Sequence, residues 1–169
     1  MNIVKGDLIK MALTGQFDFI AHGCNCHNVM SSGIAKTIRD VFPPAWEKDQ
    51  ATLKSDFNKL GNYNFAPILL DNGKYIGVIN AYTQYMPSYN GEDVFQYGAL
   101  EVILNKLAHR WGDKYFGLPL IGYGLAGGNK TKILGLISDF NDKLYSQGGS
   151  LTVVEYDPKA ETVGGQLPI

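Results

Sequence analysis

The densest group of reactive side chains lies between His22 and Asn28, where two cysteines, two histidines and two asparagines fall within seven residues. A turn of small residues, 31–33, follows directly. Side chains of these types can coordinate zinc, pair a cysteine nucleophile with a histidine base, or hydrogen-bond a polar ligand. The segment therefore has three alternative interpretations, which the spacing of its residues helps to separate.

Zinc fits this spacing poorly. Structural zinc sites usually join cysteines separated by about two to four residues to a second pair of ligands far along the chain. Cys24 and Cys26 flank a single residue, and the adjacent Cys26 and His27 cannot easily converge on one ion. No acyl-transfer signature surrounds the cysteines, so we interpret Cys24 as a small buried hydrophobe. We expect a ligand-binding loop that uses no metal and no cofactor.

A second loop, within LPLIGYGLAGGNKTKI at 118–133, carries four glycines between a hydrophobic strand and a helix. Glycine tolerates positive φ and lets backbone N–H groups approach a ligand, and the N-terminus of the following helix attracts anions. The loop is therefore predicted to hold a phosphate group. A glycine-rich turn without a ligand is the alternative.

Two familiar nucleotide-binding motifs nearly match this loop. Gly122, Gly124 and Gly127 satisfy the dinucleotide motif G-x-G-x-x-G, but only one strand is predicted after them, whereas that fold needs several. Asn129 stands where a P-loop has the glycine before its lysine. We therefore set both motifs aside.

The elements that must position these loops alternate between short β-rich runs and amphipathic helical stretches, the pattern of an α/β layer fold. The segment 65–80 is predicted to form a hairpin because Asn72-Gly73 can supply the positive φ of a tight turn, so the sheet should be mixed. Helices are predicted at 34–42, from 44 to about 56, at 97–111 and at 133–144. Each loop follows a strand and leads into a helix, so both should face one crevice at the carboxyl edge of the sheet.

Length and charge restrict the class of protein. With 169 residues and 45% hydrophobic content, the chain can bury one core, so we predict a single domain over 1–157 and a mobile tail over 158–169. The formal net charge of -1 implies no polyelectrolyte partner. The sequence shows neither a signal peptide nor an apolar run that would span a membrane. We therefore predict a cytoplasmic protein with reduced cysteines and no membrane contact.

The run HGCNCHNVMSSGIA, 22–35, resembles the ligand loop of macro domains, in particular the fungal-type ADP-ribose 1″-phosphate phosphatases, which carry a similar His-x-Cys-Asn-Cys run. The opening VKGDL, 4–8, resembles the start of a macro domain, and GYGLAGG, 122–128, resembles its second, phosphate-binding loop. The resemblance extends over nearly all of 1–157. It implies a three-layer α/β/α macro domain with a central mixed β-sheet.

The resemblance implies a site for a small-molecule ADP-ribose derivative. Asp7 would accept from the adenine amino group beside a donor on the Leu8 backbone, although Asp7 also suits the N-cap of the next helix. Asn25 would bind the distal ribose, and Tyr156 would stack on adenine or pack at the sheet edge. Ser31 and Ser32 replace glycines common in the family. Loop residues would hold the distal ribose and diphosphate, mainly through backbone N–H groups: Ser31, Ser32, Gly33, Ile34, Gly122, Tyr123, Gly124, Leu125, Ala126 and Gly127.

The implied reaction is hydrolysis of ADP-ribose 1″-phosphate to ADP-ribose and phosphate. It requires a positioned water, a proton acceptor or donor and stabilisation of negative charge. His22 is the first candidate for the catalytic acid or base and His27 the second, while Asn25 would orient the substrate or the water. For His22, a buried and hydrogen-bonded core histidine is the alternative.

Two other functions stay open in the same crevice. One is an ADP-ribosyl hydrolase acting on modified protein or nucleic acid, and the other is a non-catalytic ADP-ribose reader, so that ADP-ribosylated macromolecules are candidate partners. The chain lacks the lysine and the aspartate of the terminal ADP-ribose glycohydrolases, because 82–85 and 124–127 carry Tyr-Thr-Gln-Tyr and Gly-Leu-Ala-Gly in their places. Catalysis through a covalent lysine adduct is therefore not expected.

Overall fold

The computed structural model describes residues 1–88, 93–124 and 126–160, so Leu125 and most of the predicted tail lie outside the described part. Strands and helices alternate along the chain in this order: β1 (Asn2–Gly6), α1 (Leu8–Leu13), β2 (Phe19–Asn25), α2 (Gly33–Val41), α3 (Pro43–Gln50), the 3-10 helix η1 (Phe57–Lys59), β3 (Tyr63–Leu69), β4 (Tyr75–Gln84), α4 (Tyr97–Trp111), β5 (Tyr115–Pro119), α5 (Lys130–Tyr145) and β6 (Ser150–Tyr156).

The described strands form one six-stranded sheet in the order β1-β6-β5-β2-β4-β3. Neighbouring strands run parallel except β3, which pairs antiparallel with β4. The predicted hairpin joins these two strands, and of its two central turn residues Gly73 has the positive φ, 86°. The prediction of a mixed sheet is confirmed.

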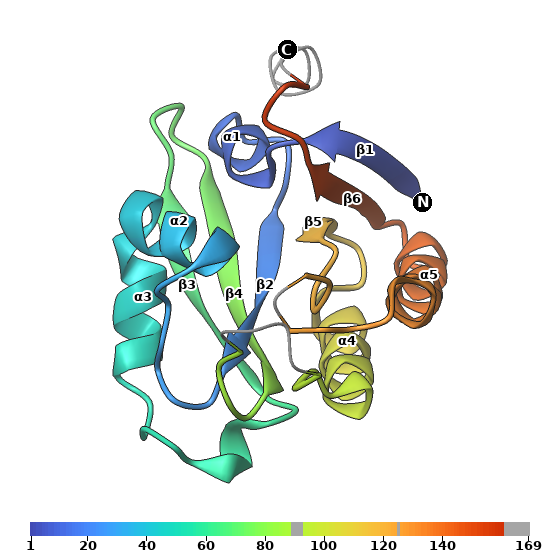
Figure 1. Cartoon of the computed structure of the whole chain (residues 1–169). Coiled ribbons are helices and arrows are strands. Elements are labelled where there is room, and N and C mark those ends of the chain that lie inside the picture. Colours follow the sequence, from blue (N-terminus) through green and yellow to red (C-terminus); the bar gives the residue numbers. More distant parts are fainter. Residues whose placement is uncertain (89–92, 125, 161–169) are drawn as a thin grey trace.

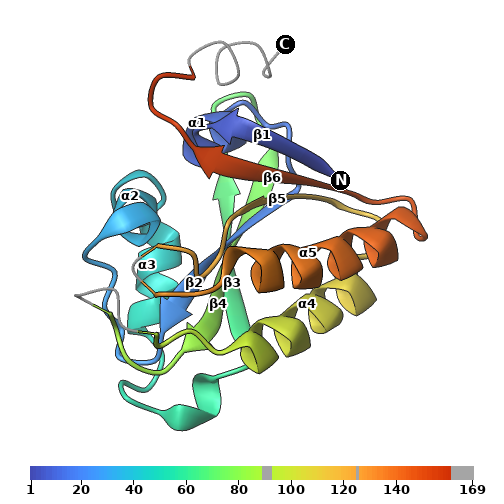
Figure 2. The ribbon, with the colours of Figure 1, turned by 45° about the vertical axis from the view of Figure 1, so that its right-hand side comes forward.

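Helices cover both faces of this sheet, as Figures 1 and 2 show. Helices α4 and α5 pack on one face, where Leu100 and Ile137 join a core that includes Phe116 of β5. Helices α1, α2 and α3 cover the other face, around buried Met11 and Ile38. The three-layer α/β/α architecture is therefore confirmed.

The two long helices match their predicted positions closely. Helix α4 occupies the predicted range, and α5 buries the predicted stripe of Ile133, Ile137, Phe140 and Leu144. Within the described residues no helix, these two included, is both long and apolar enough to span a membrane.

Helix α3 ends at Gln50, so the prediction that it continues to about Asp56 is wrong. Ser55 has a φ of 63°, which is incompatible with a right-handed helix. Its N–H donates to the carbonyl oxygen of Cys26 over 2.8 Å. After α3 the chain therefore turns back toward the end of β2, a contact that the local sequence does not reveal.

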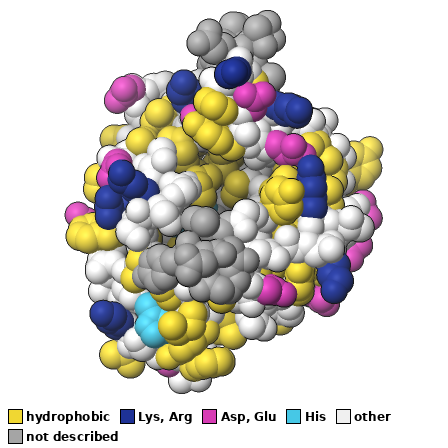
Figure 3. Space-filling view, in the orientation of Figure 1, with side chains coloured by type: hydrophobic (Ala, Val, Ile, Leu, Met, Phe, Trp, Pro, Cys, Tyr) yellow, Lys and Arg dark blue, Asp and Glu magenta, His cyan; other side chains and the backbone are white. Residues whose placement is uncertain are grey.

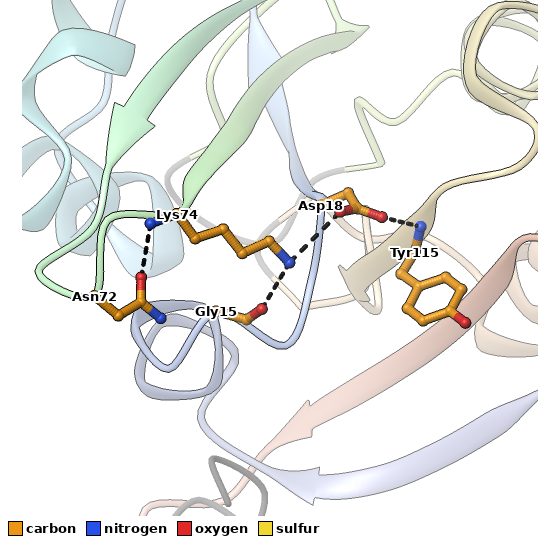
Figure 4. A network of polar contacts seen from close by, with 5 residues as sticks. All are labelled: Gly15, Asp18, Asn72, Lys74 and Tyr115. Atoms are coloured by element: carbon orange, nitrogen blue, oxygen red, sulfur yellow. Dashed lines mark hydrogen bonds and ion pairs between the residues drawn. The ribbon is translucent and has the colours of Figure 1, made fainter.

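At the amino ends of the central strands, polar groups bond with one another (Figure 4). The Nζ of Lys74 donates to the carbonyl oxygen of Gly15 over 2.7 Å and lies 3.5 Å from Oδ1 of Asp18. The Oδ2 of Asp18 accepts from the N–H of Tyr115 over 2.8 Å, and the N–H of Lys74 donates to Oδ1 of Asn72 over 2.9 Å. These contacts tie the starts of β2, β4 and β5 together, whereas ligands of such sheets bind at the opposite, carboxyl edge.

Candidate functional site

A cavity of about 550 Å³ opens at the carboxyl edge of the sheet, among the ends of β2, β4, β5 and β6 and the starts of α1 and α2. Figure 3 shows this face hollowed near its centre, with hydrophobic side chains in the depth of the hollow. Most of the residues predicted to bind a ligand line the cavity: Asp7, Leu8, Asn25, Ser31, Ser32, Gly33, Ile34, Gly122, Tyr123, Ala126 and Tyr156. Gly124 and Gly127 do not line it, and Leu125 lies outside the described residues.

The side chain of Asn25 shapes the loop to which it belongs. Its Oδ1 accepts from the N–H groups of His27 at 2.9 Å and Val29 at 3.3 Å. Its Nδ2 donates to the carbonyl oxygen of Val29 over 2.9 Å. Asn25 is buried and lines the cavity. The amide for which the family resemblance predicts a contact with the distal ribose therefore stabilises the loop at the cavity wall.

Asn28 carries the same loop through a turn with a φ of 59°. Its Oδ1 accepts from the Nζ of Lys59 over 2.5 Å, and its Nδ2 donates to the carbonyl oxygen of Thr52 over 3.0 Å. The Nζ of Lys59 also donates to Oγ1 of Thr52 over 3.0 Å and lies 5.3 Å from the centre of the Tyr82 ring. Lys59 is only 8% exposed. The buried ammonium group of Lys59 thus stabilises the first loop, 25–29. Sequence reasoning missed it because no local pattern links residues 28 and 59.

The start of α2 lies along the cavity wall. Ser32 is the N-cap residue of α2, yet its side chain makes no capping hydrogen bond. Gly33, with a φ of 58°, and Ile34 follow it along the cavity wall. The N–H groups of a first helical turn lack intrahelical partners and carry the positive end of the helix dipole. This part of the wall therefore suits an anionic group.

The second loop is built from backbone turns. The φ angles of Gly122, Gly124 and Gly127 are 83°, 94° and 75°. The N–H of Gly128 donates to the carbonyl oxygen of Gly122 over 2.9 Å. A Cβ atom on Gly122 would lie 2.4 Å from ring atoms of Phe95. Glycine is therefore required here by the fold of the loop itself, in addition to any ligand.

Asp7 marks one end of the cavity. It is the N-cap of α1, and its Oδ1 accepts from the N–H groups of Ile9 at 3.0 Å and Lys10 at 3.1 Å. The capping role predicted for Asp7 is thus confirmed. Tyr156 pairs with Gly6, the residue before Asp7, in the ladder between β1 and β6. Asp7 and Tyr156 both line the cavity, so they lie close together at this end.

The structure places His22 inside the core and does not bring it to the cavity wall. Its imidazole has no exposed surface, and its Nε2–H donates to Oδ1 of Asn80 over 2.7 Å. Burial lowers the pKa of His22 to about 4, and the hydrogen bond with Asn80 only partly offsets this effect. At neutral pH the ring is neutral and already satisfied, as the alternative interpretation of His22 predicted.

His27 also lies away from the cavity wall. Its Nδ1 is 2.9 Å from the Oγ of Ser55, and its ring packs edge-on against Tyr85 with 4.7 Å between centroids. Its Nε2 is buried without a hydrogen-bond partner among the described residues. Neither histidine is therefore positioned to transfer a proton to a ligand in this cavity.

The charged groups on the wall are few. The described lining residues include two carboxylates, Asp7 and Glu155, and no lysine, arginine or histidine. Sequence reasoning missed Glu155 and also Gln84, which lines the cavity at the end of β4. The rule that ligands gather at the carboxyl ends of strands, applied to β4 as well, would have found Gln84. An anionic ligand in this cavity would be held mainly by backbone N–H groups.

No group of three or more His, Cys, Asp or Glu side chains in the described segments is arranged to hold a metal ion. Cys24 and Cys26 are free and buried. Burial raises the pKa of the Cys24 thiol well above its ordinary value. Cys24 is therefore a protonated core residue, which agrees with its interpretation as a small hydrophobe.

Known proteins resemble this chain in sequence and in fold. No family model matches it. It is 31% identical over 160 residues to the uncharacterized 17.5 kDa protein of the tk-vs intergenic region of Enterobacteria phage T4, covering 92% of this chain and 96% of that one. A crystal structure of a Bacteroides thetaiotaomicron protein superposes with a TM-score of 0.74 and 22% identity, covering 92% of this chain and 99% of that one.

Two further solved structures have a fold similar to that of this chain. The macrodomain of Thermus aquaticus DarG has a TM-score of 0.66 and 17% identity, covering 93% of this chain and 97% of that one. Thermosipho africanus DarTG, solved in complex with ADP-ribose, has a TM-score of 0.71 and 14% identity, covering 99% of this chain and 46% of that one. The chain therefore has the macro domain fold, and it belongs to the same family as the phage T4 protein.

Proposed function

We propose that the cavity binds ADP-ribose. The observation that carries this proposal is the meeting of two strand-end loops, one leading into the N-terminus of α2 and the other rich in glycine, across one cavity of about 550 Å³. That volume falls within the range of small-molecule sites, roughly 300 to 1,000 Å³. A similar fold has been solved with ADP-ribose bound, in Thermosipho africanus DarTG.

We assign the adenine, the diphosphate and the terminal ribose of ADP-ribose to different parts of the cavity wall. The adenine amino group would donate to Asp7, whose second carboxylate oxygen is not used in capping α1. The diphosphate would accept from backbone N–H groups at the start of α2 and in the glycine loop, so no metal is needed. The terminal ribose would then reach Asn25 and Gln84 at the other end of the cavity.

For the reaction, we propose hydrolysis of ADP-ribose 1″-phosphate, in line with the resemblance of 22–35 to the fungal-type phosphatases. Asn25 and Gln84 would orient the terminal phosphate or the attacking water. His22 and His27 keep a structural role in this proposal, because neither lines the cavity.

A non-catalytic ADP-ribose reader is the second candidate. The observation that favours it is the absence of lysine, arginine and histidine from the described lining residues, since those side chains commonly stabilise charge or transfer protons in hydrolases.

The first experiment is calorimetric titration of the wild-type chain and of Asp7→Ser with ADP-ribose. Serine is also a good N-cap residue, so the stability of α1 should be retained while the carboxylate is lost. We expect wild-type binding, at least about tenfold weaker binding by Asp7→Ser, and unchanged urea unfolding. Equal affinities would contradict the role of Asp7, and no wild-type binding would contradict the proposal itself.

Incubation with ADP-ribose 1″-phosphate, with and without a metal chelator, then separates the activities. Phosphate release that persists in chelator is the expected result for the phosphatase. Binding without release would leave the reader, unless the protein frees ADP-ribose from a modified macromolecule, which would identify an ADP-ribosyl hydrolase.

A further inference from the structure

Glu155 places a carboxylate on the cavity wall, backed by a lysine. Its Oε1 lies 3.2 Å from the Nζ of Lys130, the first residue of α5. The same Nζ lies 5.8 Å from the centre of the Tyr123 ring, which belongs to the second loop and lines the cavity. Lys130 itself does not line the cavity. The lysine that pairs with Glu155 is therefore not itself part of the cavity wall.

The position of Glu155 along the cavity follows from its neighbours. The next residue, Tyr156, pairs with Gly6 and lies beside Asp7, at the end proposed for adenine. On its other side, Glu155 connects through Lys130 to Tyr123 in the loop proposed to hold the diphosphate. The part of ADP-ribose that joins adenine to the diphosphate is the adenosine ribose. Glu155 therefore faces the region where that ribose would lie.

We infer that Glu155 determines specificity at the adenosine ribose: it accepts a hydrogen bond from a free ribose hydroxyl and rejects ligands that carry a phosphate there. The inference rests on the proposed function. An ionised carboxylate is an acceptor without a proton to donate, so it pairs with a hydroxyl. A phosphate monoester is anionic near neutral pH and is repelled by a like charge. In dinucleotide-binding folds an acidic residue selects a free ribose hydroxyl in the same way.

Lys130 acts in this scheme as a positioning residue. Its ion pair holds the Glu155 side chain at the wall and offsets the repulsion between that carboxylate and the ligand diphosphate. Because Lys130 acts through its ion pair with Glu155 and does not line the cavity, it does not need to touch the ligand.

The test is calorimetric titration with ADP-ribose and with ADP-ribose 2′-phosphate, in which the extra phosphate is on the adenosine ribose. The wild-type chain should bind ADP-ribose 2′-phosphate at least about tenfold more weakly than ADP-ribose. Glu155→Gln should reduce this ratio of the two affinities, mainly by improving the binding of ADP-ribose 2′-phosphate. Glu101→Gln, which removes a carboxylate from the exposed face of α4, should leave the ratio unchanged. Equal wild-type affinities, or a ratio unaltered in Glu155→Gln, would overturn the inference.

Lys130→Met and the double variant Lys130→Met/Glu155→Gln test the positioning role. The single variant should bind both ligands about three- to tenfold more weakly, because an unpaired carboxylate then faces the diphosphate, and the double variant should recover ADP-ribose binding. A loss that persists in the double variant would mean that Lys130 contacts the phosphates itself and would overturn this role. If the wild-type chain fails to bind ADP-ribose at all, the proposed function fails, and this inference fails with it.

Discussion

The two loops that line the cavity are secured in different ways. The first, 25–29, is held by side chains: Asn25 bonds within the loop, and Asn28 bonds to Lys59 behind it. The described part of the second, 120–124 and 126–129, has turns that need positive φ, and backbone hydrogen bonds join Gly127 to Gly124 and Gly128 to Gly122. The first loop thus depends on its own asparagine side chains and on Lys59, which is far away in sequence. The turns of the second loop need glycine, because glycine tolerates positive φ.

This difference predicts opposite sensitivities. Adding one carbon atom at Gly122 should damage the second loop, whereas removing the ammonium group of Lys59 should damage the first. The stability of β2, the strand that leads into the first loop, should also depend on pH, because the buried His22 must stay neutral.

The largest effect is expected for Gly122→Ala. The new Cβ would require an unfavourable positive φ and would meet the Phe95 ring at 2.4 Å, so the free energy of unfolding should fall by about 4 kcal/mol. Urea denaturation measures this change. Gly135→Ala is the matched control, since nothing lies within 4 Å of its Cβ position in the exposed part of α5, and it should instead stabilise by about 0.5 to 1 kcal/mol. Similar changes in both variants would argue against a special role for Gly122.

The next effect concerns pH. His22 has a folded pKa of about 4 against an ordinary value of 6.5, so its contribution to stability is fully present above pH 6.5. As the pH falls from 6.5 toward 4 the unfolded chain takes up the proton first, and about 3 kcal/mol of stability should be lost. Unfolding free energies of the wild-type chain and His22→Gln, measured across this range, test the prediction. The glutamine amide can still donate to Asn80, and parallel profiles would show that His22 is not responsible.

A smaller loss is expected for Lys59→Met. The substitution keeps the length of the side chain but leaves Oδ1 of Asn28 without its cationic donor, so unfolding should become easier by about 2 kcal/mol. ADP-ribose binding should weaken in parallel, because the loop it secures lines the cavity. Lys106→Met is the control: its Nζ also contacts two oxygens, of Gly61 and Asn62, but at an exposed site. A control as destabilised as Lys59→Met would refute the importance of the buried cation.

The smallest effect is expected for Ser32→Ala. An N-cap serine normally contributes about 1 kcal/mol, but the Ser32 side chain makes no capping bond, so the change in unfolding free energy should stay below about 0.5 kcal/mol. Asn129→Ala removes a cap that does bond, to the N–H of Lys132 at 3.1 Å, and should cost about 1 kcal/mol. Thermal unfolding of the two variants measures both losses of stability. A larger loss for Ser32→Ala than for Asn129→Ala would show that the Ser32 side chain does cap α2.

Much of the fold follows from local patterns in the sequence. The hairpin at Gly73 and the apolar stripe of α5 are read correctly because a tight turn and a helical period are properties of a few adjacent residues. The end of α3 is not predicted correctly, because Ser55 has a non-helical conformation and bonds to Cys26, which is distant in sequence. Patterns within one element are thus visible in the sequence, whereas contacts between elements are not.

The same holds for the candidate site: patterns of neighbouring residues are visible in the sequence, and contacts between distant residues are not. The two loops predicted to bind a ligand are recognisable from their glycines and polar residues, and residues of both line the cavity. The supporting Lys59 and the wall residue Glu155 were missed, because only the folded chain brings them to the site. For His22, the sequence indicates a titratable group within a buried strand, but it does not show that the ring bonds to Asn80 and does not line the cavity.

The pairing of β1 with β6 has a consequence for how the cavity forms during synthesis. β1 lies at an edge of the sheet, and its one neighbour is the last strand of the described chain, with Asn2 opposite Thr152. A nascent chain therefore carries β1 unpaired until β6 has left the ribosome, and this pairing joins the first and the last strand of the described residues. A chain arrested before Ser150 would contain both loops and Asp7, yet lack the strand that brings Asp7 to the cavity. The complete cavity should thus form abruptly, once β6 has been synthesised.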